Sequence, residues 1–169
     1  MMEAREFLKG QVKNMLAWVE REQSAGELKR QLEHADEEVR AVDKKVFVKE
    51  WSMLQLALAS TLWRLCCDQY DIRDEESGKL FLREVMKRYD AATQVQEAAC
   101  FSDYICAPNV DSEGSLILSM SQKLFDRLGL ESGKQEGDQT VQIKESFKIL
   151  LYKLEGFRSA FEQRFASFF

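Results

Sequence analysis

Residues 27–77 contain neither proline nor glycine and read ELKRQLEHADEEVRAVDKKVFVKEWSMLQLALASTLWRLCCDQYDIRDEES. Proline and glycine are the residues that most strongly interrupt helices. The whole chain of 169 residues has a single proline, Pro108. It is also rich in residues that favour helices, such as Leu, Ala, Glu and Lys. The sequence therefore predicts an all-α protein built from long helices.

Within this stretch, apolar residues recur at alternating steps of four and three, which is the spacing of a coiled-coil heptad. They are Leu28, Leu32, Ala35, Val39, Val42 and Val46. The same phase continues to Met53, Leu56, Ser60, Trp63 and Cys67. Two interpretations follow: one helix from about Ala25 to Tyr70, or two helices separated near Asp43, whose carboxylate would cap a new start. We favour the continuous or gently bent helix.

A first helix is predicted from about Glu3 to Glu22, because its apolar residues are spaced by threes and fours. Ser24 and Glu27 then have the spacing of a capping box, in which the two side chains satisfy free amides at a helix start. The turn between the two helices is short. Residues 3–70 are therefore predicted to form a long antiparallel helical hairpin that opens the bundle.

Central helices are predicted over residues 74–128. One runs over residues 74–102, starting at Asp74 or a few residues later, and a shorter one runs over residues 112–128. Pro108 places a loop between the two, because proline cannot continue a helix interior.

Glycines at positions 129, 133 and 137 predict a flexible linker over residues 129–137, and Gly129 is expected to end the preceding helix. A C-terminal helix is then predicted over residues 138–169. The chain as a whole, residues 1–169, is predicted to be a single domain, an up-and-down bundle of about five helices.

Composition and charge disfavour several classes of function. The net charge of -5 disfavours binding to the phosphate backbone of nucleic acids. The most apolar run, Trp51–Cys67, is shorter than a bilayer span and contains Gln55 and Arg64, so no membrane span is expected. Residues 1–10 lack the apolar core of a signal peptide. We therefore expect a cytoplasmic protein with reduced cysteines.

No set of residues matches a catalytic or metal-binding motif. His34 is the sole histidine, which excludes the paired Glu-x-x-His motifs of di-iron bundles, and we expect it to be exposed. The four cysteines, at positions 66, 67, 100 and 106, lack the paired spacing of zinc sites. Residues 109–114 resemble the start of a calcium loop, but the twelfth position is Met120 instead of glutamate. The sequence favours a non-enzyme without metal or cofactor.

The C-terminal helix carries an aromatic stripe at steps of four and three. Its members are Phe157, Phe161, Phe165 and Phe168. Such a stripe either closes the core of a bundle or, where a helix extends beyond the bundle, inserts into a partner. Together with the heptad residues Leu32, Val39 and Val46, this stripe is the candidate partner-binding surface.

The leading functional hypothesis is a non-catalytic interaction or assembly module, such as an adaptor, a subunit or a chaperone-like bundle. Its partner would be another protein or a second copy of the chain. The alternative is a small-molecule-binding or enzymatic helical domain with a pocket between helices, lined by aromatic residues and by Met53, Met86 or Met120. A third interpretation is a nucleic-acid-associated subunit.

Overall fold

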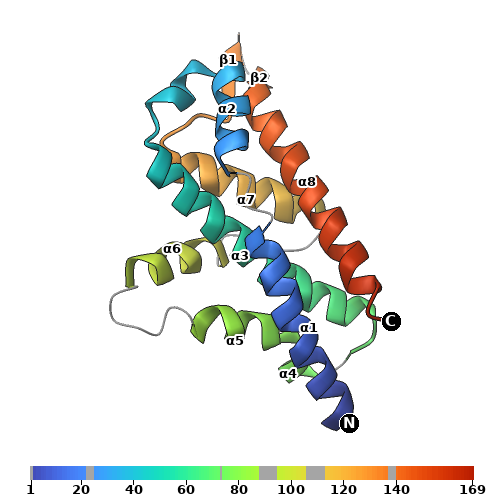
Figure 1. Cartoon of the computed structure of the whole chain (residues 1–169). Coiled ribbons are helices and arrows are strands. Elements are labelled where there is room, and N and C mark those ends of the chain that lie inside the picture. Colours follow the sequence, from blue (N-terminus) through green and yellow to red (C-terminus); the bar gives the residue numbers. More distant parts are fainter. Residues whose placement is uncertain (1, 22–24, 73, 88–94, 106–112, 137–139) are drawn as a thin grey trace.

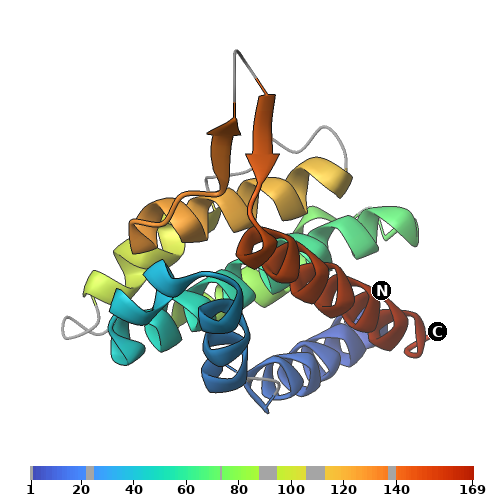
Figure 2. The same cartoon turned by 90° about the horizontal axis from the view of Figure 1, so that it is seen from above.

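The computed structural model describes residues 2–21, 25–72, 74–87, 95–105, 113–136 and 140–169. The elements in chain order are α1 Met2–Arg21, α2 Ala25–Ala35, the 3-10 helix η1 Glu37–Ala41, α3 Lys44–Gln69, α4 Glu75–Gly78, α5 Leu80–Lys87, α6 Val95–Ile105, α7 Glu113–Leu128, β1 Gly133–Glu136, β2 Thr140–Ile143 and α8 Glu145–Ala166. Helices make up most of the described chain and pack into one bundle (Figure 1, Figure 2). The prediction of an all-α helical bundle is confirmed.

Helix α3 lies at the centre of this bundle. Every residue from Met53 to Trp63 is buried. Helices α1, α2, α5, α6, α7 and α8 all pack against α3, and both views show it running through the middle of the molecule (Figure 1, Figure 2). A helix that is apolar around its whole circumference must be covered on every side. The remaining helices are therefore arranged as a cover around α3.

The helix predicted over residues 25–70 is broken, so the continuous interpretation is wrong and the alternative of a break near Asp43 is confirmed. The chain leaves the helical conformation after α2, forms η1 and re-enters it at α3. Asp36 accepts a hydrogen bond from the amide of Glu38 at 3.2 Å, and Asp43 accepts one from the amide of Lys45 at 2.8 Å. Carboxylates that bind nearby amides compete with the backbone hydrogen bonds of a continuous helix and favour new helix starts.

The first two helices pack differently from the predicted hairpin over residues 3–70. Helix α1 packs on α3 and α5, whereas α2 packs on α3 and α8. In Figure 1, α2 lies near the top of the molecule and α1 near the bottom. Each of the two helices thus covers a different part of α3, which accounts for their separation.

The helix predicted over residues 74–102 is divided into α4, α5 and α6, and residues 88–94 lie outside the described chain. Asp74 caps α4 by accepting a hydrogen bond from the amide of Glu76 at 3.1 Å, and it also accepts one from the Ser77 hydroxyl at 2.9 Å. The carbonyl of Ser77 in turn accepts a hydrogen bond from the indole nitrogen of Trp63, also at 2.9 Å. This contact fixes the turn before α5 against the central helix.

Helix α7 ends at Gly129, as predicted. Gly129 has a φ of +71°, in the left-handed region that glycine adopts most readily. The amide of Leu130 donates to the carbonyl of Phe125 at 2.8 Å, and the amide of Gly129 donates to the carbonyl of Asp126 at 3.2 Å. These two hydrogen bonds form a Schellman motif that closes the helix.

The prediction of a flexible linker over residues 129–137 is wrong for the part that forms β1. Strand β1 pairs with β2 in an antiparallel hairpin, with Gly133 opposite Ile143. The C-terminal helix α8 therefore begins at Glu145 and not at residue 138. The strand β2 reads TVQI, in which β-branched residues favour an extended conformation over a helix.

A buried ionic cluster joins α3 to α6 and α7. The Glu50 carboxylate accepts two hydrogen bonds from the Arg127 guanidinium, at 2.7 and 3.0 Å, and one from the Tyr104 hydroxyl at 2.7 Å. The Cys100 thiol donates to the same carboxylate at 3.3 Å, and Arg127 also pairs with Asp103. Burial raises the pKa of Glu50, but the hydrogen bonds from Arg127 and Tyr104 outweigh it and leave the pKa below its usual value.

Replacing Arg127 by methionine should destabilise the protein strongly, because it leaves a buried carboxylate without its cation. We expect Arg127→Met to lower the free energy of unfolding in urea at pH 7 by about 3–5 kcal/mol. The control Arg83→Met removes an exposed arginine that pairs with Glu76 and should cost much less stability, because solvent screens exposed ion pairs. Equal losses for the two variants would contradict this account.

The stability lost in Arg127→Met should also depend on pH, and it should be smaller in acid. Because the pKa of Glu50 is lowered in the folded protein, the stability that it contributes is fully present above the unfolded value of 4.5. That contribution is lost as the pH falls through the lowered pKa. The difference between wild type and Arg127→Met should therefore shrink in acid, as measured by urea unfolding over a pH series.

Candidate functional site

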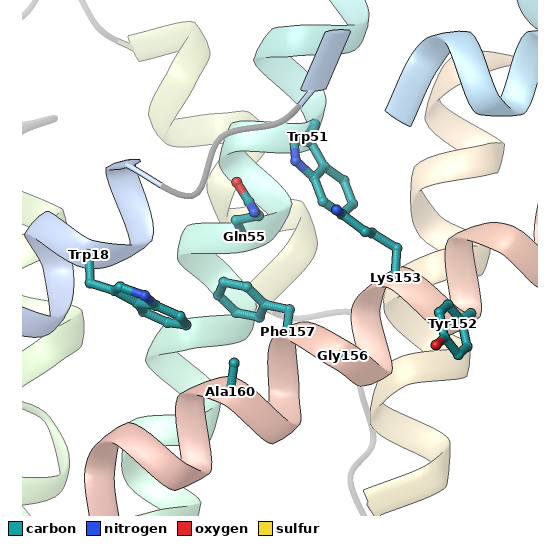
Figure 3. A pocket seen from close by; sticks show the side chains of 8 residues that line it. All are labelled: Trp18, Trp51, Gln55, Tyr152, Lys153, Gly156, Phe157 and Ala160. Atoms are coloured by element: carbon teal, nitrogen blue, oxygen red, sulfur yellow. The ribbon is translucent and has the colours of Figure 1, made fainter. Parts of the chain in front are cut away.

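A cavity of about 290 Å³ lies between α1, α3 and α8 (Figure 3). Its lining residues come from three segments that are far apart in the sequence. They are Trp18 of α1, Trp51 and Gln55 of α3, and Tyr152, Lys153, Gly156, Phe157 and Ala160 of α8. Its volume is at the small end of the range for cavities that bind organic ligands.

Aromatic rings form the apolar wall of this cavity. The ring of Trp18 stacks on that of Phe157, with centroids 5.6 Å apart and an angle of 20° between planes. The guanidinium of Arg164 lies 5.5 Å from the centroid of the Trp18 ring. This cation–π contact also helps to hold the indole ring in place. The wall is thus built from side chains that are themselves held in place.

Two buried polar atoms of α3 have no hydrogen-bond partner among the described residues, and both belong to side chains that line the cavity. They are the indole nitrogen of Trp51, a donor, and the Oε1 atom of Gln55, an acceptor. Trp51 is 0% exposed and Gln55 is 2% exposed. Buried polar groups nearly always have partners, because an unmade hydrogen bond costs about 1–3 kcal/mol. The indole nitrogen of Trp63, by contrast, is satisfied by Ser77.

Lys153 supplies the one positive charge among the lining residues, and no acidic residue is among them. Its side chain is half-buried and forms no ion pair with any residue that the structure describes. The neighbouring Lys148 on the same helix instead donates to Glu145 at 3.0 Å. The cavity therefore combines an aromatic wall, a donor, an acceptor and a cation.

Gly156 lies in the interior of α8, between Tyr152 and Ala160 on the ridge of the helix that lines the cavity. A glycine in a helix interior is less favourable than alanine by about 1 kcal/mol. A Cβ atom at Gly156 would meet no other atom within 4 Å, so close packing does not require glycine there. The absent side chain leaves the wall of the cavity open at this position.

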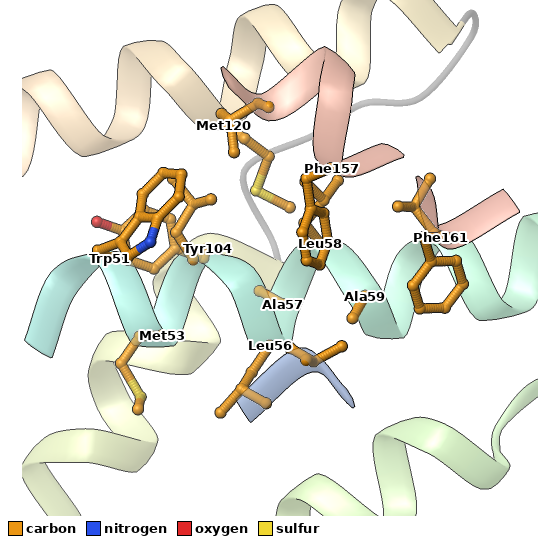
Figure 4. Packing of buried hydrophobic residues seen from close by; sticks show 14 of the residues in the cluster. Trp51, Met53, Leu56, Ala57, Leu58, Ala59, Tyr104, Met120, Phe157 and Phe161 are labelled. Atoms are coloured by element: carbon orange, nitrogen blue, oxygen red, sulfur yellow. The ribbon is translucent and has the colours of Figure 1, made fainter. Parts of the chain in front are cut away.

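The predicted aromatic stripe is packed into the bundle. Phe161 and Phe165 are 0% exposed and Phe157 is 9% exposed, while Phe168 is partly buried against the core. Figure 4 shows Phe157 and Phe161 beside α3. The stripe therefore closes the core, the first of the two roles that such a pattern can have, and only Phe157 of the four lines the cavity.

The heptad residues are also mostly internal. Leu32 and Val39 are 0% exposed, whereas Val46 is 46% exposed because it follows the break before α3. The methionines predicted to line a pocket do not line this cavity: Met53 and Met120 are buried in the core, and Met86 is 37% exposed. The seam is thus divided by the break and presents no continuous face.

Among the described residues, the other candidate chemistry of the sequence gives no second site. The part of the chain described by the structure holds no group of three His, Cys, Asp or Glu side chains able to bind a metal. Burial raises the pKa of the Cys67 thiol to about 12 and that of the Cys100 thiol to about 11, so both are unreactive at neutral pH. His34 is exposed, as predicted, and Cys106 and residues 109–112 lie outside the described residues.

Two further observations concern the chain as a whole. Among the described helices, none has the length and apolar character needed to cross a bilayer. The chain matches no protein-family model, no curated protein and no solved structure.

Sequence reasoning missed Trp18, Trp51, Lys153 and Gly156 as site residues. The two available signals were a polar Gln55 inside the most apolar run and a glycine inside a strongly periodic helix. Neither signal shows by itself that the two positions lie beside one another.

Removing the unpaired amide oxygen of Gln55 should stabilise the ligand-free protein. We expect Gln55→Met, which has a similar volume, to raise the free energy of unfolding in urea by about 1 kcal/mol. Gln122→Met is the control, because the Gln122 amide donates to Asp126 at 2.9 Å, and this change should leave stability within about 0.5 kcal/mol. A marked loss of stability in Gln55→Met would show that its amide is satisfied in the folded protein.

Proposed function

We propose that this chain is a small-molecule-binding helical domain whose ligand occupies the cavity between α1, α3 and α8. The observation that carries the proposal is the pair of unpartnered buried atoms, Trp51 Nε1 and Gln55 Oε1, at a single aromatic cavity. A ligand with one acceptor and one donor would satisfy both atoms and bury its apolar surface against Trp18 and Phe157. Proteins commonly retain such unfavourable groups where binding requires them.

The proposed role is binding without catalysis. None of the lining residues is a histidine, cysteine, aspartate or glutamate, which are the side chains that most often act as general acids, bases or nucleophiles. Binding energy here would come from aromatic contacts and from two or three hydrogen bonds, as in other small apolar pockets.

A protein-interaction role is a second proposal, and it concerns a different surface from the predicted stripe. A shallow groove of about 540 Å³ between α2 and α8 is lined by Gln31, His34, Lys148, Ile149 and Tyr152. Tyr152 is 82% exposed, and an exposed tyrosine beside a partly apolar groove is common at protein interfaces. Another protein or a second copy of the chain would be the partner.

Filling the cavity at position 156 should abolish ligand binding without harming the fold. Indole-3-acetamide, a neutral probe with a ring, a donor and an acceptor, should raise the melting temperature of the wild type by about 3–6 °C at about ten times its Kd. In Gly156→Leu this shift should disappear. The ligand-free variant should itself melt about 2–3 °C higher, because leucine favours the helix.

Gly10→Leu is the matched control. Gly10 lies inside α1, a Cβ atom there would also meet nothing within 4 Å, and it does not line the cavity. This variant should keep the full ligand-induced shift, as measured by circular dichroism. A wild type that does not respond to the probe, or an equal response in both leucine variants, would contradict the proposal.

A further inference from the structure

We infer that the ligand of this cavity is a small aromatic carboxylic acid, bound as its anion. This inference rests on the proposed function and specifies the chemistry of the ligand. The carboxylate would accept hydrogen bonds from the indole nitrogen of Trp51 and from the ammonium of Lys153. A second polar group on the ligand, a donor such as N–H or O–H, would bind Gln55 Oε1.

The charge of the lining residues selects an anion. Lys153 carries the one formal charge among them, so the lining as a whole is positive although the chain as a whole has a net charge of -5. Two other lysines of low exposure have carboxylate partners: Lys144 binds Asp36 and Glu38, and Lys29 binds Glu33. At Lys153 the ligand would provide the carboxylate that the protein provides elsewhere.

The Lys153 side chain lies at the Trp51 end of the cavity. In Figure 3 the Lys153 side chain extends from α8 toward Trp51, while Trp18 and Ala160 lie at the other end beyond Phe157. A ligand carboxylate placed between Lys153 and Trp51 would form hydrogen bonds in which the acceptor is charged, and such bonds are about twice as strong as neutral ones. The ring of the ligand would then lie against Trp18 and Phe157.

The size of the cavity favours a small anionic ligand. At about 290 Å³ it accommodates one or two fused rings with a short acid group, not a dinucleotide or a long acyl chain. Gly156 and the exposed Tyr152 lie at the edge of the cavity on the α8 side.

The test compares two probes of nearly the same size and shape, the anion indole-3-acetate and the neutral indole-3-acetamide, by isothermal titration calorimetry at pH 7 and low salt. We expect the wild type to bind the acetate about tenfold more tightly than the acetamide. The preference should decrease as salt is added, because Lys153 is partly exposed to solvent.

Lys153→Met should bind the two probes with equal affinity, and Lys153→Gln, which keeps a donor without the charge, should do the same. Lys123→Met is the matched control, because it removes another half-buried lysine that lies outside the cavity and should retain the tenfold preference. Far-ultraviolet circular dichroism confirms that each variant is folded.

The outcomes separate the proposal of a small-molecule cavity from the inference that its ligand is an anion. Equal binding of both probes by the wild type would overturn the inference about charge and leave the small-molecule pocket in place. A preference that survives in Lys153→Met and Lys153→Gln would also overturn it, because the anion would then be recognised elsewhere. Absence of binding by either probe would contradict the proposed function and, with it, the inference.

Discussion

Helix α3 must be covered along its whole circumference, and this requirement organises the molecule. The buried run from Met53 to Trp63 leaves no face of the helix for water. Helices from both halves of the chain therefore pack around it, and the division of the predicted hairpin into α1 and α2 places each over a different part of α3. At its N-terminal end, Glu50 fixes α6 and α7 through Tyr104 and Arg127.

The candidate cavity is the part of the α3 surface that α1 and α8 do not fill completely. The contact between Trp18 and Phe157 joins the two covering helices, while Trp51 and Gln55 lie beside them without polar partners in the described chain. Gly156 keeps the adjacent ridge of α8 free of a side chain. The unpaired polar atoms and the glycine in the helix interior are unfavourable for folding alone. Their coincidence at one place is what supports a role in binding a ligand.

The sequence predicts helix content and most buried faces because both depend on local spacing. The stripe of Phe157, Phe161 and Phe165 is buried at the spacing that predicted it. The break before α3 was harder to predict from the sequence. It depends on particular hydrogen bonds that Asp36 and Asp43 accept from nearby amides, which compete with a continuous helix. The strands were missed because three nearby glycines suggested a linker. The cavity could not be predicted, because it forms where side chains from three distant helices leave space.

The central functional proposal is that the indole N–H of Trp51 donates a hydrogen bond to a bound ligand. The NMR signals of the tryptophan indole N–H groups report on this contact directly. The chain has three tryptophans, and Trp63 is the internal reference because its N–H already donates to Ser77. On titration with indole-3-acetate, the indole N–H signal of Trp51 should move with saturation while that of Trp63 stays in place. An unchanged Trp51 signal at saturating ligand, or an equal shift of Trp63, would contradict the account.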